Sequence, residues 1–325
     1  MRAIVVLLHE GGLQTAGGLY NECKGISGPI VDIVNRMDDE IDAVISGHTH
    51  QAYNCEIDNK LVTSASSYGR LVTDIDLTID RRTRDVRSAK AENVIVTRDV
   101  EAAPDLTTLV AKYKALVGPI ENRVIGRITG TITKVANAAG EAALGDVIAD
   151  AQLAATDGED EGGAQIAFMN PGGIRADLTG PPEGDTDVTY GEAFTVQPFG
   201  NNVVTLTLTG AQIEQLLEAQ WLGQPFPRIL QVSQGFSYAW SASAPAGSKV
   251  DPASITLNGT TIDSAASYRV TVNSFLADGG DNFVILREGT NRLGGVLDID
   301  ALEAYFAAAA GPVAPGPQDR IRVVE

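Results

Sequence analysis

The chain has 325 residues, of which 44% are hydrophobic and 20% are charged, which is a globular composition long enough for two domains. The formal net charge of −18 and the pI near 4.5 argue against a nucleic-acid polymer or an anionic membrane as partner, because either would be repelled. No stretch reaches membrane-spanning length. We therefore expect a small-molecule ligand, and an anionic one would need a local cationic site. The oligomeric state stays open.

The first hundred residues predict alternating strands and helices followed by further strands. Residues 3–8 and 41–46 are rich in Val, Ile and Leu, which is typical of strands covered on both faces. Between them, Pro29 begins a predicted helix over residues 29–37. Residues 71–80 alternate between apolar and polar side chains, so they predict a half-buried antiparallel strand.

The rest of the chain predicts a connector helix and a second, mixed α/β domain. Ala103, Pro104 and Asp105 open an amphipathic helix that reaches about Leu116. We expect domains at residues 1–100 and 123–325, joined by a connector at 101–122. In the second domain we expect a hairpin turn at residues 257–260, and regular elements at 141–155, 164–169, 203–208, 211–220, 299–308 and 320–324.

All three histidines of the chain follow the two apolar strands near its start. His9 follows residues 3–8, and His48 and His50 follow residues 41–46. One histidine after a strand is commonly only a hydrogen-bonded loop residue. That all three histidines follow a strand favours a metal site instead. Alternate residues of an extended segment point the same way, so the side chains of His48 and His50 could bind one metal cluster.

Two cysteines flank the second histidine strand. Cys23 and Cys55 could meet if the loop after His9 folds back on the strand after His50. A disulfide would imply an oxidising compartment, whereas two buried free thiols are equally compatible with the sequence.

Three loops of the second domain carry side chains suited to a ligand, and we expect each to follow a strand. The first contains Gly172 and Gly173, whose backbone N–H groups are accessible, and Arg175, whose guanidinium suits phosphate. The other two each hold one phenylalanine, Phe199 or Phe275, among small and polar residues. Two such rings could clamp a base, although both could instead fill gaps at the domain surface.

Taken together, these motifs resemble the secreted 5′-nucleotidase family of metallophosphatases, which includes bifunctional UDP-sugar hydrolases. The resemblance covers nearly the whole chain. It rests on Leu8 and His9 with Gly11 and Gly12, on 47–50, on 144–146 with 149–151, and on 170–175, 198–201 and 273–281.

The resemblance implies a fold and a set of site residues. The first domain would be the remnant of a metallophosphatase β-sandwich flanked by helices, with two divalent ions such as zinc or manganese in the intact family site. His9 and His48 would ligate one ion and His50 the other. In the second domain a nucleotide or nucleoside would bind through Asn170, Gly172, Gly173, Arg175, Phe199, Asn201, Phe275 and Asp281.

The chain departs from the family pattern at the front. The family's Asp-x-His, Gly-Asp and Gly-Asn-His-Glu or Gly-Asn-His-Asp motifs, which supply a bridging aspartate and the catalytic histidine, do not occur in the metal domain. Arginines that often precede the position of Glu141 are also absent, so Arg175 is expected to hold the phosphate alone. We expect a truncated chain that binds one metal ion or none, cut by a gene model, a gene split or deliberate construction.

The sequence therefore predicts a nucleotide-hydrolysing metallophosphatase of nucleotide catabolism and salvage whose present chain is catalytically incomplete. The alternative is a non-catalytic module that binds nucleosides or nucleotides, and a purely structural surface protein is a third option. The family resemblance implies a secreted, periplasmic or cell-surface location, although no signal peptide is recognised in the chain.

Overall fold

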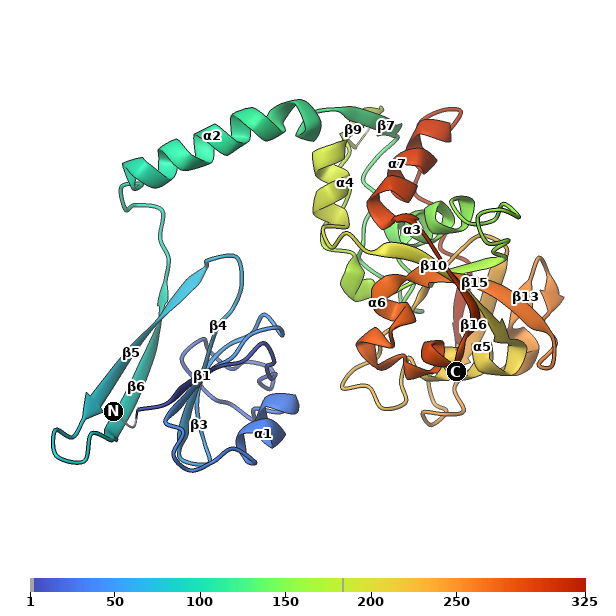
Figure 1. Ribbon diagram of the computed structural model, residues 1–325. Coiled ribbons are helices and arrows are strands. Elements are labelled where there is room, and N and C mark those ends of the chain that lie inside the picture. Colours follow the sequence, from blue (N-terminus) through green and yellow to red (C-terminus); the bar gives the residue numbers. More distant parts are fainter. Residues whose placement is uncertain (1–2, 183) are drawn as a thin grey trace. The chain divides into compact units, whose positions relative to one another are not determined.

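The fold is described by a computed structural model that places residues 3–182 and 184–325 (Figure 1). The chain divides into two compact units, Met1–Thr107 and Thr108–Glu325. The fold class is mixed α/β, as the sequence predicts. Within the described part of the chain, none of the helices combines the length and the apolar character that crossing a membrane requires.

The first unit is built around a small mixed sheet. Its four strands run in the order β1-β2-β4-β3, where β1, β2 and β4 are parallel and β3 pairs antiparallel with β4. A separate antiparallel hairpin, β5-β6, contains the predicted half-buried strand. The elements are β1 (Val5–Leu7), α1 (Pro29–Val34), β2 (Ala43–Ile45), β3 (Ala52–Ile57), β4 (Lys60–Ala65), β5 (Leu71–Ile79) and β6 (Val86–Ile95).

Strand β1 is more exposed than its sequence predicts. The side chains of Val5 and Leu7 are 41% and 78% exposed, whereas Val6 packs against the core formed by α1, β2, β3 and β4. The residue types of β1 are typical of a strand covered on both faces, but within the described residues only one of its faces contacts the core.

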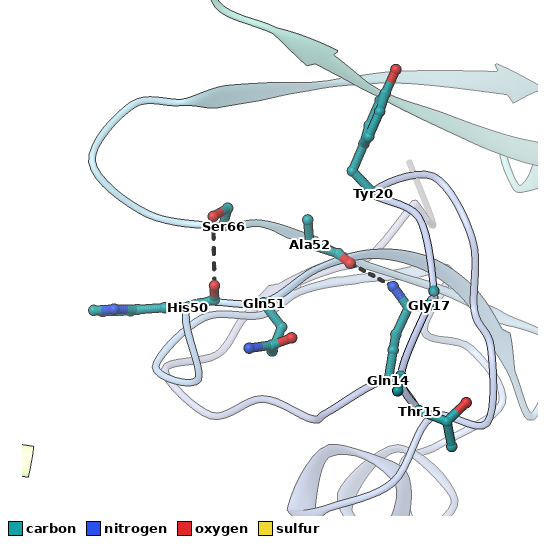
Figure 2. A pocket seen from close by; sticks show the side chains of 10 residues that line it. Gln14, Thr15, Gly17, Tyr20, His50, Gln51, Ala52 and Ser66 are labelled. Carbon is teal, nitrogen blue, oxygen red and sulfur yellow. Dashed lines mark hydrogen bonds between the residues drawn. The ribbon is translucent and has the colours of Figure 1, made fainter. Parts of the chain in front are cut away.

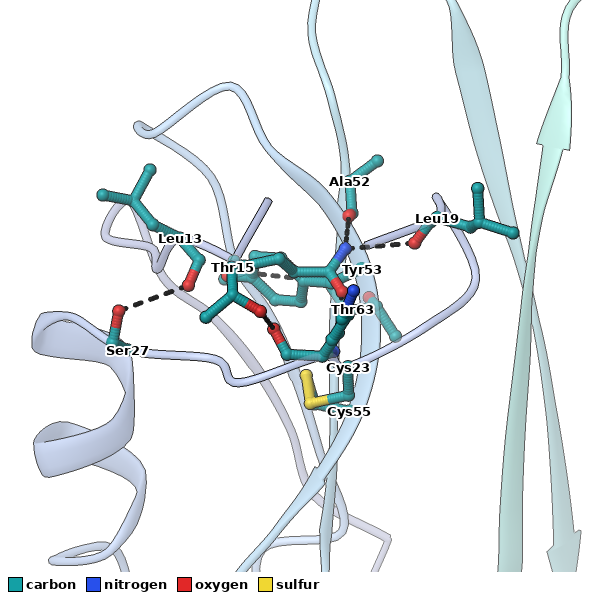
Figure 3. Close-up of a disulfide and its surroundings, with 12 residues drawn as sticks. Leu13, Thr15, Leu19, Cys23, Ser27, Ala52, Tyr53, Cys55 and Thr63 are labelled. Atoms are coloured by element: carbon teal, nitrogen blue, oxygen red, sulfur yellow. Dashed lines mark hydrogen bonds between the residues drawn. A yellow bond between two sulfur atoms is a disulfide. The ribbon is translucent and has the colours of Figure 1, made fainter. Parts of the chain in front are cut away.

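A disulfide joins the loop before α1 to strand β3 (Figure 3). Cys23 and Cys55 are bonded, with their Cα atoms 4.9 Å apart and a sequence separation of 32. Cys55 is buried in the core of the first unit. The structure thus decides between the two alternatives that the sequence left open, in favour of the disulfide.

Replacing both cysteines by serine is expected to destabilise the first unit by about 3 kcal/mol, because the disulfide restricts the unfolded chain across this loop. The measurement is urea-dependent proteolysis that follows cleavage sites within residues 3–100. Both tryptophans, Trp221 and Trp240, lie in the second unit, so its fluorescence transition should not move. A proteolysis midpoint equal to that of the wild type would contradict this expectation.

The second unit contains a five-stranded sheet, β11-β8-β15-β10-β16, and a four-stranded sheet, β14-β13-β12-β17. The pair β7-β9 forms a third, smaller sheet. The strands of the second unit are β7 (Val124–Ile128), β8 (Ile166–Met169), β9 (Thr186–Thr189), β10 (Asn202–Thr209), β11 (Gln231–Val232), β12 (Phe236–Ser241), β13 (Thr256–Leu257), β14 (Thr260–Thr261), β15 (Ser267–Asn273), β16 (Thr290–Leu297) and β17 (Ile321–Val324).

Helices pack against these sheets through two apolar clusters. The predicted connector helix is present as α2 and continues past Leu116 to Glu121, with none of its residues buried. The boundary between the two units falls within it. The helices are α2 (Pro104–Glu121), α3 (Ala143–Ala154), α4 (Tyr190–Val196), α5 (Gly210–Glu218), α6 (Ser274–Ala277) and α7 (Asp298–Ala308).

Helix α4 is absent from the sequence prediction. Thr189 and Glu192 form a capping box at its start, in which the Thr189 side chain accepts from the Glu192 N–H and the Glu192 carboxylate accepts from the Thr189 N–H. This Thr-x-x-Glu spacing is visible in the sequence and could have located the helix. The helix places the segment after Val196, which carries Phe199 and Asn201.

Helix α3 holds an acidic side chain in the interior of the second unit. Asp146 is only 2% exposed, and neither carboxyl oxygen has a hydrogen-bond partner among the described residues. The neighbouring Asp150 forms two bonds to Arg320, while the Glu141 carboxylate accepts from the backbone N–H of Ile321. Burial raises the pKa of Asp146 to about 8; Arg320 opposes this shift, and the charge of Glu141 adds to it.

Candidate functional site

Two of the three histidines meet in the first unit. The ring centroids of His9 and His48 are 5.2 Å apart in an edge-on arrangement. The loops that carry them pack closely, since the Thr49 hydroxyl donates to the Gly12 carbonyl at 2.9 Å. A Cβ atom on Gly11 would collide with the Gly47 carbonyl and with Thr49. Glycine at position 11 is therefore what allows the two histidine loops to approach.

The segment after β2 is not extended. His48 and His50 both have positive φ, 65° and 55°, so the alternation expected of an extended chain does not apply between them. The prediction that their side chains point the same way on that ground is wrong. The His50 ring lies edge-on to Tyr68, with a centroid distance of 5.7 Å.

The histidines do not by themselves form a dinuclear metal centre. Within residues 3–182 and 184–325, no group of three or more His, Cys, Asp or Glu side chains is arranged to hold a metal ion. Two divalent ions about 3.5–4 Å apart repel one another and need a shared anionic ligand, which imidazoles do not supply. Metal ligation by His9, His48 and His50 stays a prediction.

A hollow of about 400 Å³ lies beside His50 (Figure 2). The loop 14–18 forms one wall, and the Gln14 side chain is fixed there by donating to the carbonyls of Ala52 and Leu19 at 2.8 and 3.0 Å. The remaining lining residues are Tyr20, His50, Gln51, Ala52 and Ser66. This hollow offers hydrogen-bonding groups and no fixed cation for a phosphate.

In the second unit, three loops meet at one edge of the five-stranded sheet because of its topology. Strands β8 and β15 are parallel neighbours, so their carboxyl ends, at Met169 and Asn273, lie at the same edge. Strand β10 is antiparallel to β15 and pairs Val203 with Asn273, so its amino end meets them there. The segments before β10 and after β8 and β15 are those in which the sequence predicts the ligand site.

Asparagine and aspartate side chains link two of these loops. The Asn170 amide donates to Asp281 Oδ2 at 2.8 Å and accepts from the Asn273 amide at 2.9 Å. Asn273 also accepts from the Leu276 N–H, which caps α6. Gly172 lies against the pair, since a Cβ atom there would be 3.5 Å from Asp281 Oδ2. Asn170 and Asp281 therefore form one rigid polar cluster.

The two predicted rings are accessible. Phe199 is 56% exposed and Phe275 is 44% exposed, whereas core aromatic residues are buried. The Arg175 guanidinium lies over the Phe199 ring at 5.6 Å and donates to the Gly172 carbonyl at 3.1 Å. Phe275 packs so closely on Gly280 that a Cβ atom at position 280 would clash with the ring. Phe275 thus lies next to Asp281.

Asp298, the first residue of α7, belongs to the same region and was not singled out from the sequence. It is 2% exposed, and burial raises its pKa to about 6, although the hydrogen bond from Asn201 opposes the shift. Asn201 in turn accepts from the Ser274 hydroxyl at 3.2 Å, which connects the loop of Phe199 to that of Phe275. A buried aspartate at a helix start has no distinctive local motif that could have marked it.

Comparison with known proteins agrees with this arrangement. The family described as 5′-nucleotidase, C-terminal domain, matches residues 124–288. The chain is 30% identical to part of Endonuclease YhcR of Bacillus subtilis, over 100% of this chain and 25% of that protein. It is 31% identical to Cell wall protein Lmo0130 of Listeria monocytogenes, over 87% of this chain and 38% of that protein.

A solved structure shows the same fold. The 5′-nucleotidase precursor from Thermus thermophilus superimposes with a TM-score of 0.66 and 28% sequence identity, over 91% of this chain and 62% of that chain. The chain spans well under half the length of the two relatives from Bacillus subtilis and Listeria monocytogenes. The family match covers half of the chain and contains all three loops that converge at the sheet edge, so the chain belongs to the 5′-nucleotidase family.

Proposed function

We propose that the second unit binds the nucleoside part of a nucleotide at the edge formed by β8, β10 and β15. The observation that carries this proposal is the cluster of Asn170 and Asp281 beside two exposed rings. Phe199 and Phe275 would stack on the base, which contributes about 1–3 kcal/mol per ring. Asp281 would accept hydrogen bonds from ribose hydroxyls.

The phosphate would lie toward the loop between Asn170 and Arg175. This loop offers backbone N–H groups of Gly172 and Gly173, and the guanidinium of Arg175 is a donor suited to phosphate oxygens. The chain carries a net charge of −18, so an anionic ligand depends on such local donors. The ligand class supported here is a nucleoside 5′-phosphate or a related nucleotide.

We propose further that the chain is part of a metal-dependent phosphoester hydrolase and that it is catalytically incomplete by itself. Bound divalent ions would activate water and neutralise charge on phosphorus. His9 and His48 lie together, but among the described residues no carboxylates join them in a group that could hold a metal ion. The carboxylate ligands of a pair of ions would have to be supplied by other residues.

Purified chain supplied with manganese or zinc is expected to release no inorganic phosphate from 5′-AMP, while calorimetry shows that it binds adenosine. His48→Ala serves as the matched variant for the phosphate assay. Phosphate release by the wild type that His48→Ala lacks would contradict the proposed incompleteness. Absence of adenosine binding would contradict the proposed nucleoside site.

The alternative is a module that binds nucleosides without any hydrolysis. The division of the chain favours it, because the proposed nucleoside site consists of residues of the second unit, whereas His9 and His48 belong to the first. Joining the chain to a family metal domain that carries the absent motifs separates the two. Hydrolysis that depends on His48 supports the enzyme, and adenosine binding without hydrolysis supports the module.

We also propose an oxidising, extracytoplasmic location. The Cys23–Cys55 disulfide supports this, because such bonds persist mainly outside the reducing cytosol. A relative named as a cell wall protein is consistent with it. Thiol labelling of the protein taken directly from its native source should find both cysteines blocked, and two reactive thiols would contradict the proposal.

A further inference from the structure

A turn with an unusual backbone presents the carboxylate of Asp281. Asp281 and Asn282 both have positive φ, 53° and 64°, a region that side chains other than glycine rarely occupy. Two adjacent residues in this conformation cost energy, and they persist only where the surroundings impose it. The contacts that hold this turn therefore decide where the Asp281 carboxylate points.

A neighbouring segment, residues 221–228, supplies those contacts, and we call it the brace segment. The Gln224 amide donates to the Asp281 carbonyl at 2.8 Å, and the Asn282 amide donates to the Gly223 carbonyl at 3.1 Å. Both bonds involve the two residues with positive φ or their side chains. The brace segment thus stabilises the backbone of the turn from outside it.

Arg228 acts on the carboxylate itself. Its Nε lies 3.6 Å from Asp281 Oδ1, while Asp281 Oδ2 accepts from Asn170 on the opposite side. The guanidinium is fixed in turn, because Nη1 donates to Gln224 Oε1 and the plane lies 4.8 Å from the centre of the Phe226 ring. The Asp281 carboxylate thus lies between a hydrogen-bond donor, Asn170, and an ion-pair partner, Arg228.

The sequence of the brace segment makes it stiff. Pro225 and Pro227 flank Phe226, and each fixes its own φ and restricts the residue before it. The Arg228 N–H also donates to the Gln220 carbonyl at 2.9 Å, which anchors the end of the segment to the turn after α5. A stiff segment can hold Asp281 without losing much conformational freedom when a ligand binds.

We propose that Arg228 is a positioning residue which, through Asp281, makes the site prefer ribonucleosides over nucleosides without ribose hydroxyls. This assignment rests on the proposed nucleoside site. A carboxylate has about four acceptor positions; Asn170 occupies one on Oδ2, and Arg228 faces Oδ1 as an ion-pair partner. The remaining positions have a fixed direction, so they can accept from the 2′ and 3′ hydroxyls of a ribose held against Phe275.

The test compares calorimetric affinities for adenosine and for 2′,3′-dideoxyadenosine in the full chain. The wild type is expected to prefer adenosine by about tenfold or more, because a hydrogen bond to a charged group typically contributes this much to affinity. In Arg228→Gln the adenosine affinity should fall about fivefold while the dideoxyadenosine affinity stays unchanged. Arg228→Lys keeps the charge and should recover part of the preference.

The matched control is Arg292→Gln. Arg292 pairs with Asp278, on the same loop, at 2.7 Å, and it lies outside the contacts of Asp281. This variant should behave as the wild type toward both ligands. Equal weakening of both ligands in Arg228→Gln would show a general structural role, and unchanged affinities for both ligands would show no role, so either result overturns the assignment.

A second measurement does not require a ligand. Amide hydrogen exchange of residues 279–283 should be faster in Arg228→Gln than in the wild type and unchanged in Arg292→Gln. Exchange in Arg228→Gln equal to that of the wild type would contradict the proposed role of the brace segment. Failure of the wild type to bind adenosine, with the exchange difference present, would overturn the proposed function and the ribose preference while the brace itself stands.

Discussion

Phe199→Ala combined with Phe275→Ala is expected to weaken adenosine binding by about a hundredfold or more, since each stacked ring contributes about 1–3 kcal/mol. The rings are 56% and 44% exposed, so their removal leaves little cavity and the unfolding transition should hardly move. The measurement is calorimetric titration with adenosine, beside thermal unfolding of the same variants.

Phe194→Ala is the matched control for the ring variants. Phe194 is also largely exposed, and its ring stacks on Tyr190 within α4. Its truncation removes a comparable surface ring from the same unit without touching the loops of the site. Full affinity in the double variant, or an equal loss in Phe194→Ala, would show that Phe199 and Phe275 do not hold a base.

Asp146→Asn is expected to stabilise the second unit by about 3 kcal/mol at pH 8 and to have little effect at pH 4. The pKa of Asp146 is about 8 in the folded protein, against 3.8 as the ordinary value. The folded state therefore binds an extra proton between these values. Wild-type stability should fall as pH rises from about 4 to 8 and level off above, because the folded state then loses its extra proton as well.

Asparagine carries no charge, so the variant should show a smaller decline, and the part that remains below about pH 6 comes from Asp298, whose pKa burial also raises. Urea titrations at several pH values, followed by the fluorescence of Trp221 and Trp240, report on the second unit alone. Asp150→Asn is the control in the same helix: it breaks the two bonds to Arg320 and should destabilise the unit. Parallel pH profiles for wild type and Asp146→Asn would contradict the assigned protonation.

The sequence is sufficient to predict the long elements. The helices α3, α5 and α7 and the hairpin at Asn258 and Gly259, both with positive φ, are confirmed. These features depend on local patterns of apolar residues and on turn chemistry, which a sequence displays directly. The apolar run of β1 is a counterexample, because burial depends on what packs against a strand.

The side-chain partners of the site depend on contacts between distant parts of the chain. Asn170 meets Asp281 across 111 residues, and Asn201 meets Asp298 across 97. No local spacing encodes such pairs, so the sequence does not mark Asp298 or Arg228 as residues of the site. The positive φ of His48 and His50 is likewise a tertiary result: the Gly11 loop packs against this turn.

The sheet edge formed by the carboxyl ends of β8 and β15 and the amino end of β10 has a consequence for folding. Its loops come from three places in the chain, and the sheet order inserts β15 between β8 and β10 although it follows both in sequence. Contacts between distant residues form slowly, since the entropy of closing long loops must first be overcome. The loops of the proposed nucleoside site can therefore meet only after β15 has paired between β8 and β10, so we expect a ligand to stabilise the folded domain without speeding its folding.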